Sequence, residues 1–194
     1  MTRSAFPRAA AIPLALTGLR AALAPVMVLL ALMWPAPGAF AACLAAAFLS
    51  DVFDGIVARR LGVATPALRR LDSIADSIFY VGALFAAWHL HPSALRDHAA
   101  ALVVLGVLEA ARYAVDLRKF GKEASYHMWS SKLWGVALFA GFVALLAFRE
   151  ERWFVPAAIW IGIAADVEGL AISFTLAEWR NDVPTIFHAR RLRG

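Results

Sequence analysis

The chain has 194 residues and a formal net charge of +5, with 62% hydrophobic and only 17% charged residues. An ordinary soluble domain is roughly 45–50% apolar and about 25% charged, so this composition excludes a soluble core and indicates an integral membrane protein. A pI near 10 would suggest nucleic acid in a soluble protein, but in a membrane protein anionic headgroups and phosphorylated substrates are simpler partners. We therefore expect a lipid bilayer and no nucleic acid as partners.

Six apolar stretches recur along the chain, most of them near the ~20 residues that cross a bilayer. They cover Ile12 to Trp34, Pro37 to Ile56, Leu71 to Leu90, His98 to Val115, Leu133 to Phe148 and Trp153 to Leu176. Short connections with turn residues separate them, and no linker long enough to divide two domains is visible. We predict an all-α integral membrane fold with six transmembrane helices in one domain, residues 1–194.

The first stretch has an alternative interpretation as a secretory signal, because "GAFAAC" ending at Cys43 offers small residues to a peptidase. Arg20 interrupts the apolar run and another hydrophobic helix follows at once, which favours a retained transmembrane helix. Cys43 is the only cysteine, so we expect no internal disulfide and no cysteine-based zinc site.

Lysine and arginine distribute unequally between the two sides of the six predicted spans. One side holds fourteen, which are Arg3, Arg8, Arg59, Arg60, Arg69, Arg70, Arg118, Lys119, Lys122, Lys132, Arg180, Arg190, Arg191 and Arg193. The other side holds Arg96, Arg149 and Arg152, while Arg20 and Arg112 fall within spans. The positive-inside rule then places the N- and C-termini, and the loop after the second span, in the cytoplasm.

The second predicted helix carries two carboxylates at its cytoplasmic end. Asp51 and Asp54 are three residues apart, and the same side continues with the small residues Gly55 and Ala58. A face of this kind has room for a bulky polar ligand close to the helix backbone.

The third predicted helix brings two more carboxylates to the same end. Thr65 followed by Pro66 predicts its start, with a hydroxyl at the N-cap and a proline at the first helical position. Leu68, Asp72 and Asp76 then follow at four-residue spacing, on one stripe of the helix. Two antiparallel helices thus point four carboxylates at each other near the cytoplasmic surface.

Four carboxylates at such a place require cations. An ionised group at membrane depth costs about 2.5–3.5 kcal/mol on insertion scales, and like charges add repulsion. One interpretation is an ion-paired hairpin without chemistry, neutralised by the flanking arginines, which are Arg59, Arg60, Arg69 and Arg70. The other is a functional site, because clustered aspartate oxygens suit Mg²⁺ or Mn²⁺ and arginines can hold phosphates.

The later predicted spans contain further polar residues with two interpretations each. Glu109 and Arg112 are three apart and form either an intrahelical ion pair or the wall of an acceptor pocket. Lys132 opens the fifth span, as a snorkelling anchor or as a contact for an acceptor phosphate. Asp166 and Glu168 lie inside the last span and are expected to face the bundle interior.

The aspartate segment resembles the signature of the CDP-alcohol phosphatidyltransferases, D-x2-D-G-x2-A-R-x8-G-x3-D-x3-D. Seven of its eight fixed elements match in order, with Asp51, Asp54, Gly55, Ala58, Arg59, Asp72 and Asp76 at the corresponding positions. The second glycine of the signature falls on Leu68, and a leucine on the stripe of Asp72 is expected to displace the substrate. Weaker similarity extends to "IPLALTGLRAALAP" at 12 to 25 and "SSKLWG" at 130 to 135.

The resemblance implies metal-dependent transfer of a phosphatidyl group from CDP-diacylglycerol to a hydroxyl acceptor, with release of CMP. An alternative within the family is transfer of a phosphoalcohol from a soluble CDP-alcohol to a lipid hydroxyl. The resemblance also implies six transmembrane helices, an active site at the cytoplasmic face of the inner (cytoplasmic) membrane, and a homodimer.

The resemblance also assigns roles to individual residues. Mg²⁺ or Mn²⁺ ligands are expected at Asp51, Asp54, Asp72 and Asp76, and Asp76 is in addition the expected catalytic base. Contacts to CDP are expected from Gly55, Ala58, Arg59 and, unless it is only an N-cap, Thr65. We expect a small, anionic hydroxyl acceptor bound by Lys132 and Arg112.

A cation transporter or channel is the hypothesis from a different class, because intramembrane carboxylates can bind and pass cations. A conduction path would spread ionisable residues through several spans towards the far side. Here they concentrate at one interface, which favours the transferase.

Overall fold

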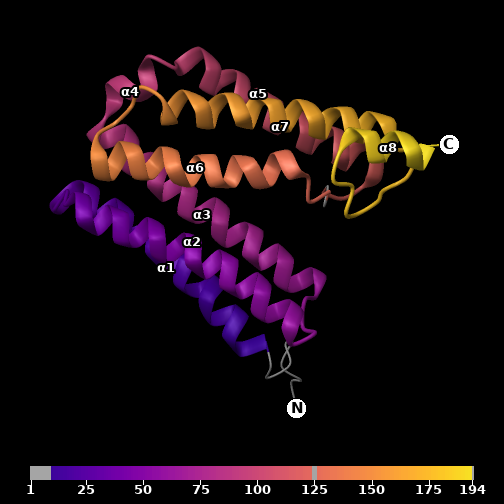
Figure 1. The fold of residues 1–194 in the computed structure, drawn as a ribbon, viewed down its shortest axis with the longest axis horizontal. Coiled ribbons are helices and arrows are strands. Elements are labelled where there is room, and N and C mark those ends of the chain that lie inside the picture. Colours follow the sequence, from indigo (N-terminus) through magenta and orange to yellow (C-terminus); the bar gives the residue numbers. More distant parts are fainter. Residues whose placement is uncertain (1–9, 124–125, 194) are drawn as a thin grey trace. The chain divides into compact units, whose positions relative to one another are not determined.

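The computed structural model describes residues 10–123 and 126–193, and these residues form helices and no β-strand (Figure 1). The chain divides into two compact units. Among the described residues, the first unit contains 10–92 and 146–149, and the second contains 93–123, 126–145 and 150–193. The expected all-α class is thus confirmed.

The first unit contains α1 (Ala11–Met33), α2 (Pro37–Arg60) and α3 (Pro66–Leu90). The second contains α5 (Ala99–Phe120), most of α6 (Trp129–Phe148), α7 (Phe154–Thr175) and α8 (Ile186–Arg193), and the short α4 (Pro92–Arg96) lies at the border. The sequence patterns did not predict α4 and α8, because neither is a long apolar stretch.

Five helices, α1, α2, α3, α6 and α7, are long and apolar enough to cross a membrane. They agree with five of the six expected spans. The sixth, α5, is a helix of 22 residues at the expected place, but Glu109, Arg112 and Asp116 interrupt its apolar sequence. Its crossing therefore stays a prediction, as does the side of the membrane on which the termini lie.

In the first unit α1 packs against both α2 and α3. Its buried face repeats every three or four residues, with Pro13, Thr17, Arg20, Ala24, Met27 and Ala31. Close approach of α3 depends on Gly82, where an added Cβ would lie 2.8 Å from the carbonyl oxygen of Ala24. The polar members of the face, Thr17 and Arg20, therefore point towards the neighbouring helices instead of lipid.

The connection between α2 and α3 has strong local signals. Gly62 adopts a left-handed φ of +65°, and the amide of Val63 donates to the carbonyl of Ala58 at 3.0 Å, which together form a Schellman C-cap. Thr65 then caps α3, since its side chain accepts a hydrogen bond from the amide of Leu68 at 3.2 Å. The start of α3 at Thr65 and Pro66 is confirmed, and the turn fixes how α2 and α3 present their aspartates.

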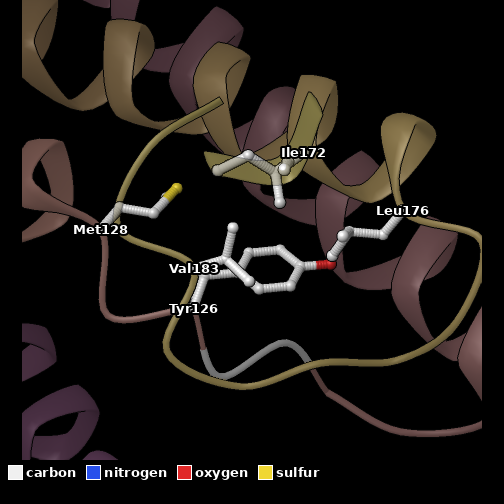
Figure 2. Close-up of a cluster of buried hydrophobic side chains, with 6 residues drawn as sticks. Tyr126, Met128, Ile172, Leu176 and Val183 are labelled. Atoms are coloured by element: carbon white, nitrogen blue, oxygen red, sulfur yellow. The ribbon is translucent and has the colours of Figure 1, made fainter. Parts of the chain in front are cut away.

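In the second unit α5 and α8 both pack against α7. An apolar cluster joins the ends of these elements (Figure 2), with Tyr126, Met128, Ile172, Leu176, Val183 and Ala189 buried in it. The Lys119 ammonium donates to the carbonyls of Ser173 and Leu176 at 2.8 and 2.7 Å. It thereby satisfies unpaired carbonyls at the C-terminal end of α7.

Candidate active site

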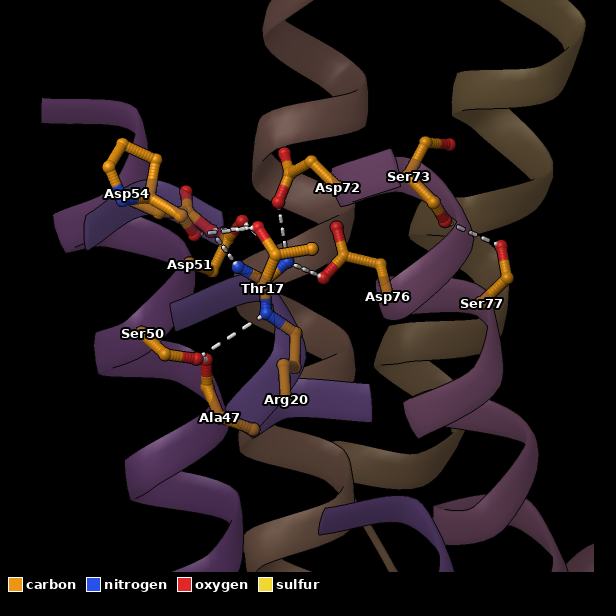
Figure 3. Close-up of polar contacts among 11 residues, drawn as sticks. Thr17, Arg20, Ala47, Ser50, Asp51, Asp54, Asp72, Ser73, Asp76 and Ser77 are labelled. Atoms are coloured by element: carbon orange, nitrogen blue, oxygen red, sulfur yellow. Dashed lines mark hydrogen bonds and ion pairs between the residues drawn. The ribbon is translucent and has the colours of Figure 1, made fainter. Parts of the chain in front are cut away.

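Arg20 on α1 lies at the centre of the four aspartates of the first unit (Figure 3). Its guanidinium is 3.2 Å from Asp51, 2.5 Å from Asp54 and 2.9 Å from Asp72, and it also contacts Asp76. The Arg20 side chain is only 2% exposed. One buried cation therefore contacts all four carboxylates, which the sequence predicted to lie close together.

Asp54 differs from the other three aspartates in its surroundings. Its side chain is 5% exposed, and besides Arg20 it accepts a hydrogen bond from the Thr17 hydroxyl at 3.4 Å. Thr17 also donates to the carbonyl of Pro13 at 3.0 Å. Asp54 is thus held against α1 inside the unit, and it is the least accessible of the four carboxylates.

The other three aspartates form a more open group. The side chains of Asp51, Asp72 and Asp76 are 46%, 32% and 36% exposed, and each offers a carboxylate oxygen within 4.8 Å of the other two. Hard divalent cations prefer carboxylate oxygens, so this donor set fits Mg²⁺ or Mn²⁺. The geometry brings three of the four expected ligands together, with Asp54 beside them on Arg20.

Each of the four aspartates forms an ion pair with Arg20 on α1, a cation that neither interpretation of the aspartate segment included. Arg20 is 30 or more residues away in sequence from the groups it contacts, so helical spacing could not identify it. A signal was present, however, since an arginine inside an apolar span requires an acidic partner.

The expected CDP contacts lie in two different environments. Gly55 is half-buried, and the Arg59 guanidinium lies 3.2 Å from the point where a Cβ on Gly55 would sit. Ala58 is 6% exposed and belongs to an apolar cluster. Thr65 is the N-cap of α3. Gly55 and the exposed Arg59 therefore offer the more accessible surface to a nucleotide.

Leu68, the departure from the signature, is a packing residue. It is 4% exposed and lies in a cluster with Ala10, Ala58 and Val63, against which Leu14 also packs. Its side chain fills the corner under the connection between α2 and α3, and displacement of the substrate by this leucine stays a prediction.

Arg112 in the second unit contacts two acids. It donates to Glu109 at 2.9 Å, as expected for an intrahelical ion pair, and its Nε lies 3.5 Å from Asp166. Asp166 is fully buried, as expected for a carboxylate that faces the bundle interior. Gly169 makes room for Arg112, because a Cβ at that position would lie 2.7 Å from the Arg112 Cδ.

Three lysines of the second unit differ in the contacts that they make. Lys119 is bound to carbonyls at the end of α7, and the Lys122 ammonium lies 3.9 Å from the centre of the Trp179 ring. Lys132 is exposed, with its ammonium 4.5 Å from the ring centre of Trp129. Lys122 and Lys132 are both exposed, each over a tryptophan ring, so both are more available to a ligand than Lys119.

Sequence reasoning missed a buried network around Asp116. Asp116 is 2% exposed and accepts hydrogen bonds from the hydroxyls of Ser173 at 2.6 Å and Tyr126 at 3.3 Å. Burial raises the pKa of Tyr126 to about 12, so its hydroxyl stays protonated at neutral pH. These contacts fasten the segment after α5 to α7.

Comparisons with known proteins identify one family. A family model described as CDP-alcohol phosphatidyltransferase matches residues 10–167, a range that includes Arg20, the four aspartates and Lys132. No curated protein and no solved structure matches the chain.

Proposed function

The chain belongs to the CDP-alcohol phosphatidyltransferase family, and from this membership we propose that it transfers the phosphatidyl group of CDP-diacylglycerol to a hydroxyl acceptor and releases CMP. Family membership itself implies a membrane transferase of phospholipid biosynthesis that moves a phosphoalcohol group from a CDP-alcohol to an acceptor. The observation that carries the proposal is the convergence of four aspartates of the family signature on one site.

We assign divalent-metal binding, by Mg²⁺ or Mn²⁺, to Asp51, Asp72 and Asp76, with Asp54 completing the set. The mutual approach of three of these carboxylates within 4.8 Å supports the assignment. A bound divalent ion supplies positive charge for the non-bridging oxygens of a pyrophosphate.

The reacting residue is Asp76, the base that the family signature indicates. It accepts the proton of the acceptor hydroxyl on a carboxylate oxygen while the hydroxyl oxygen forms a bond to phosphorus. The bond between that phosphorus and the CMP oxygen breaks, and CMP leaves with the electron pair.

Other side chains position the reactants. Arg20 holds the four carboxylates together through direct contacts, and displacement at phosphorus depends mainly on positioning and electrostatic stabilisation. Arg59 and the small residue Gly55 offer a charged donor and an open helix surface for the pyrophosphate and nucleotide. Ala58 and Thr65 support this surface through packing and capping.

For the acceptor we propose a small, water-soluble, anionic alcohol. The exposed ammonium of Lys132 supports an anionic group, and Arg112, engaged by Glu109 and Asp166, contributes less free charge. We further propose that residues 1–194 act as one membrane domain with six spans. The active site then faces the cytoplasm at the inner membrane, and the chain forms a homodimer.

The test is CMP release by reconstituted protein with Mg²⁺ or Mn²⁺. CDP-diacylglycerol is supplied with glycerol phosphate, inositol phosphate, serine, inositol or phosphatidylglycerol, and a soluble CDP-alcohol is supplied with a lipid hydroxyl in a parallel series. We expect acceptor-dependent CMP release from CDP-diacylglycerol, with a product of matching mass. Turnover of the soluble donor alone would instead support the phosphoalcohol branch, and absence of CMP release from both would refute the proposal.

A further inference from the structure

The helix α8 is fixed at the end of α7. Its inward residues Ile186 and Ala189 pack in the apolar cluster that includes Ile172 and Leu176, and the amide of Ile186 donates to Glu168 at 3.1 Å. Because α7 is a candidate membrane span that ends at Thr175, α8 lies where the chain leaves the apolar layer.

The outward face of α8 carries large apolar side chains. Phe187 is 67% exposed and Leu192 is 45% exposed, and the other exposed residues of the helix are His188, Arg190 and Arg191. Phe187 shares a stripe with Arg191, and His188 shares the next stripe with Leu192, since residues four apart are neighbours on a helix surface. The exposed side of α8 therefore combines two large apolar side chains with the cationic Arg190 and Arg191, and helices in the membrane interface combine arginine with phenylalanine and leucine.

The charge of α8 is entirely positive. Its sequence "IFHARRLR" contains no acidic residue, and Arg190 and Arg191 are exposed. In the part of the chain that the structure describes, neither arginine forms an ion pair with an acidic side chain. Asp182 contacts His127 at 2.7 Å, and Glu168 accepts from the α8 backbone. The face therefore complements an anion, not a second copy of itself.

The surroundings of α8 resemble a membrane–water boundary. The amide of Trp129 at the start of α6 donates to the carbonyl of Pro184, just before α8, at 3.2 Å. Trp129 is 66% exposed and has the ammonium of Lys132 over its ring. Exposed tryptophan beside lysine is the composition found at headgroup level.

We propose that α8 is an interfacial helix that binds the phosphate groups of anionic lipids through Arg190 and Arg191, with Phe187 and Leu192 inserted at the boundary with the acyl chains. Arginine forms charge-assisted hydrogen bonds to phosphate oxygens. The two apolar side chains can contact the acyl chains of a lipid, whereas free phosphate offers them no apolar group. Lipid binding by α8 is independent of the proposed transferase activity.

Hydrogen exchange of the full-length protein in nanodiscs tests the proposal. Exchange is followed for peptides covering α8 in phosphatidylcholine discs and in discs that also contain phosphatidylglycerol. We expect slower exchange of α8 in the anionic discs. Each of the single variants Arg190→Gln and Arg191→Gln should lower the protection factor of α8 in these discs by about five-fold. The charge-preserving pair Arg190→Lys and Arg191→Lys should keep most of it, and Arg152→Gln, outside α8, should keep all.

Several results would overturn the proposal. Equal protection in both kinds of disc, or full protection in the double glutamine variant, would remove anionic lipid as the ligand. Protection by inorganic phosphate in phosphatidylcholine discs would assign a soluble anion instead. Protection that rises with protein concentration at fixed lipid composition would indicate a second copy of the chain. The glutamine substitutions could detach α8 from α7 and so remove protection for a structural reason. In that case, a loss of protection in the charge-preserving lysine variants as well would contradict the proposal.

Discussion

Replacing Arg20 by glutamine removes the one buried cation that joins four carboxylates. The Arg20 side chain is 2% exposed, and its partner Asp54 is 5% exposed. Removing one partner of a buried ion pair destabilises a protein by about 3–5 kcal/mol, because the remaining charge stays buried without compensation. Arg20→Gln should therefore destabilise the protein by this amount when no divalent metal is present.

The corresponding change in melting temperature is large enough to measure. At roughly 2–4 °C per kcal/mol for a chain of this size, the midpoint should fall by about 6–20 °C in EDTA. Adding Mg²⁺ should return part of the loss, because a cation held by the same carboxylates replaces the charge of the guanidinium. Binding at about 100 times the dissociation constant contributes about 2.7 kcal/mol. The variant should gain more from Mg²⁺ than the native protein, whose Arg20 competes for the same oxygens.

Thermal unfolding of detergent-solubilised protein, followed by tryptophan fluorescence in EDTA and in Mg²⁺, measures both effects. Arg69→Gln is the matched control, since Arg69 is exposed at the start of α3 and a surface substitution usually changes stability by less than about 0.5 kcal/mol. Equal melting temperatures for Arg20→Gln and Arg69→Gln in EDTA would refute the reasoning.

Three further substitutions test other contacts, each by thermal unfolding. Gly82→Ala should destabilise the protein by about 1–3 kcal/mol, because the added Cβ would lie 2.8 Å from a backbone oxygen of α1. Gly106→Ala is the control and should be neutral or stabilising, because an added Cβ there meets no atom within 4 Å. Equal effects of the two substitutions would contradict the close packing of α1 and α3. Lys119→Met should destabilise by about 1–3 kcal/mol through lost bonds to the carbonyls of α7, and more than Lys122→Met. Thr65→Ala should lose about 1 kcal/mol of capping energy, and an added rise in the KM for the CDP-alcohol would show a nucleotide contact as well.

Local spacing predicted the parts of the site that depend on one helix. Asp51 and Asp54, three apart, and Asp72 and Asp76, four apart, must share helix faces, and Thr65 followed by Pro66 marks a helix start whatever surrounds it. These expectations needed no knowledge of tertiary structure. The structure agrees with them because helical periodicity and capping are decided within a few residues.

Contacts between distant residues could not be predicted in this way. Arg20 reaches Asp72 and Asp76 across 52 and 56 residues of sequence, and no periodicity connects them. Leu68 shares a stripe with Asp72 in sequence, yet the turn at Gly62 brings apolar residues from before and after it together, and Leu68 packs among them. The role of Lys119 depends on carbonyls of α7 and was equally invisible. Charge and spacing identify candidates, but packing selects their partners.

The central claim is that the four aspartates form one metal-dependent site for transfer from a CDP-alcohol. The most direct test is CMP release from CDP-diacylglycerol by the native protein and by the four aspartate-to-asparagine variants, with Mg²⁺ and after its removal by EDTA. We expect EDTA to abolish release and Mg²⁺ to restore it. Each variant should lose about 10²–10⁴-fold in rate, while Asp97→Asn, an exposed residue outside the site, keeps native activity. Near-native CMP release by all four aspartate variants would contradict the account.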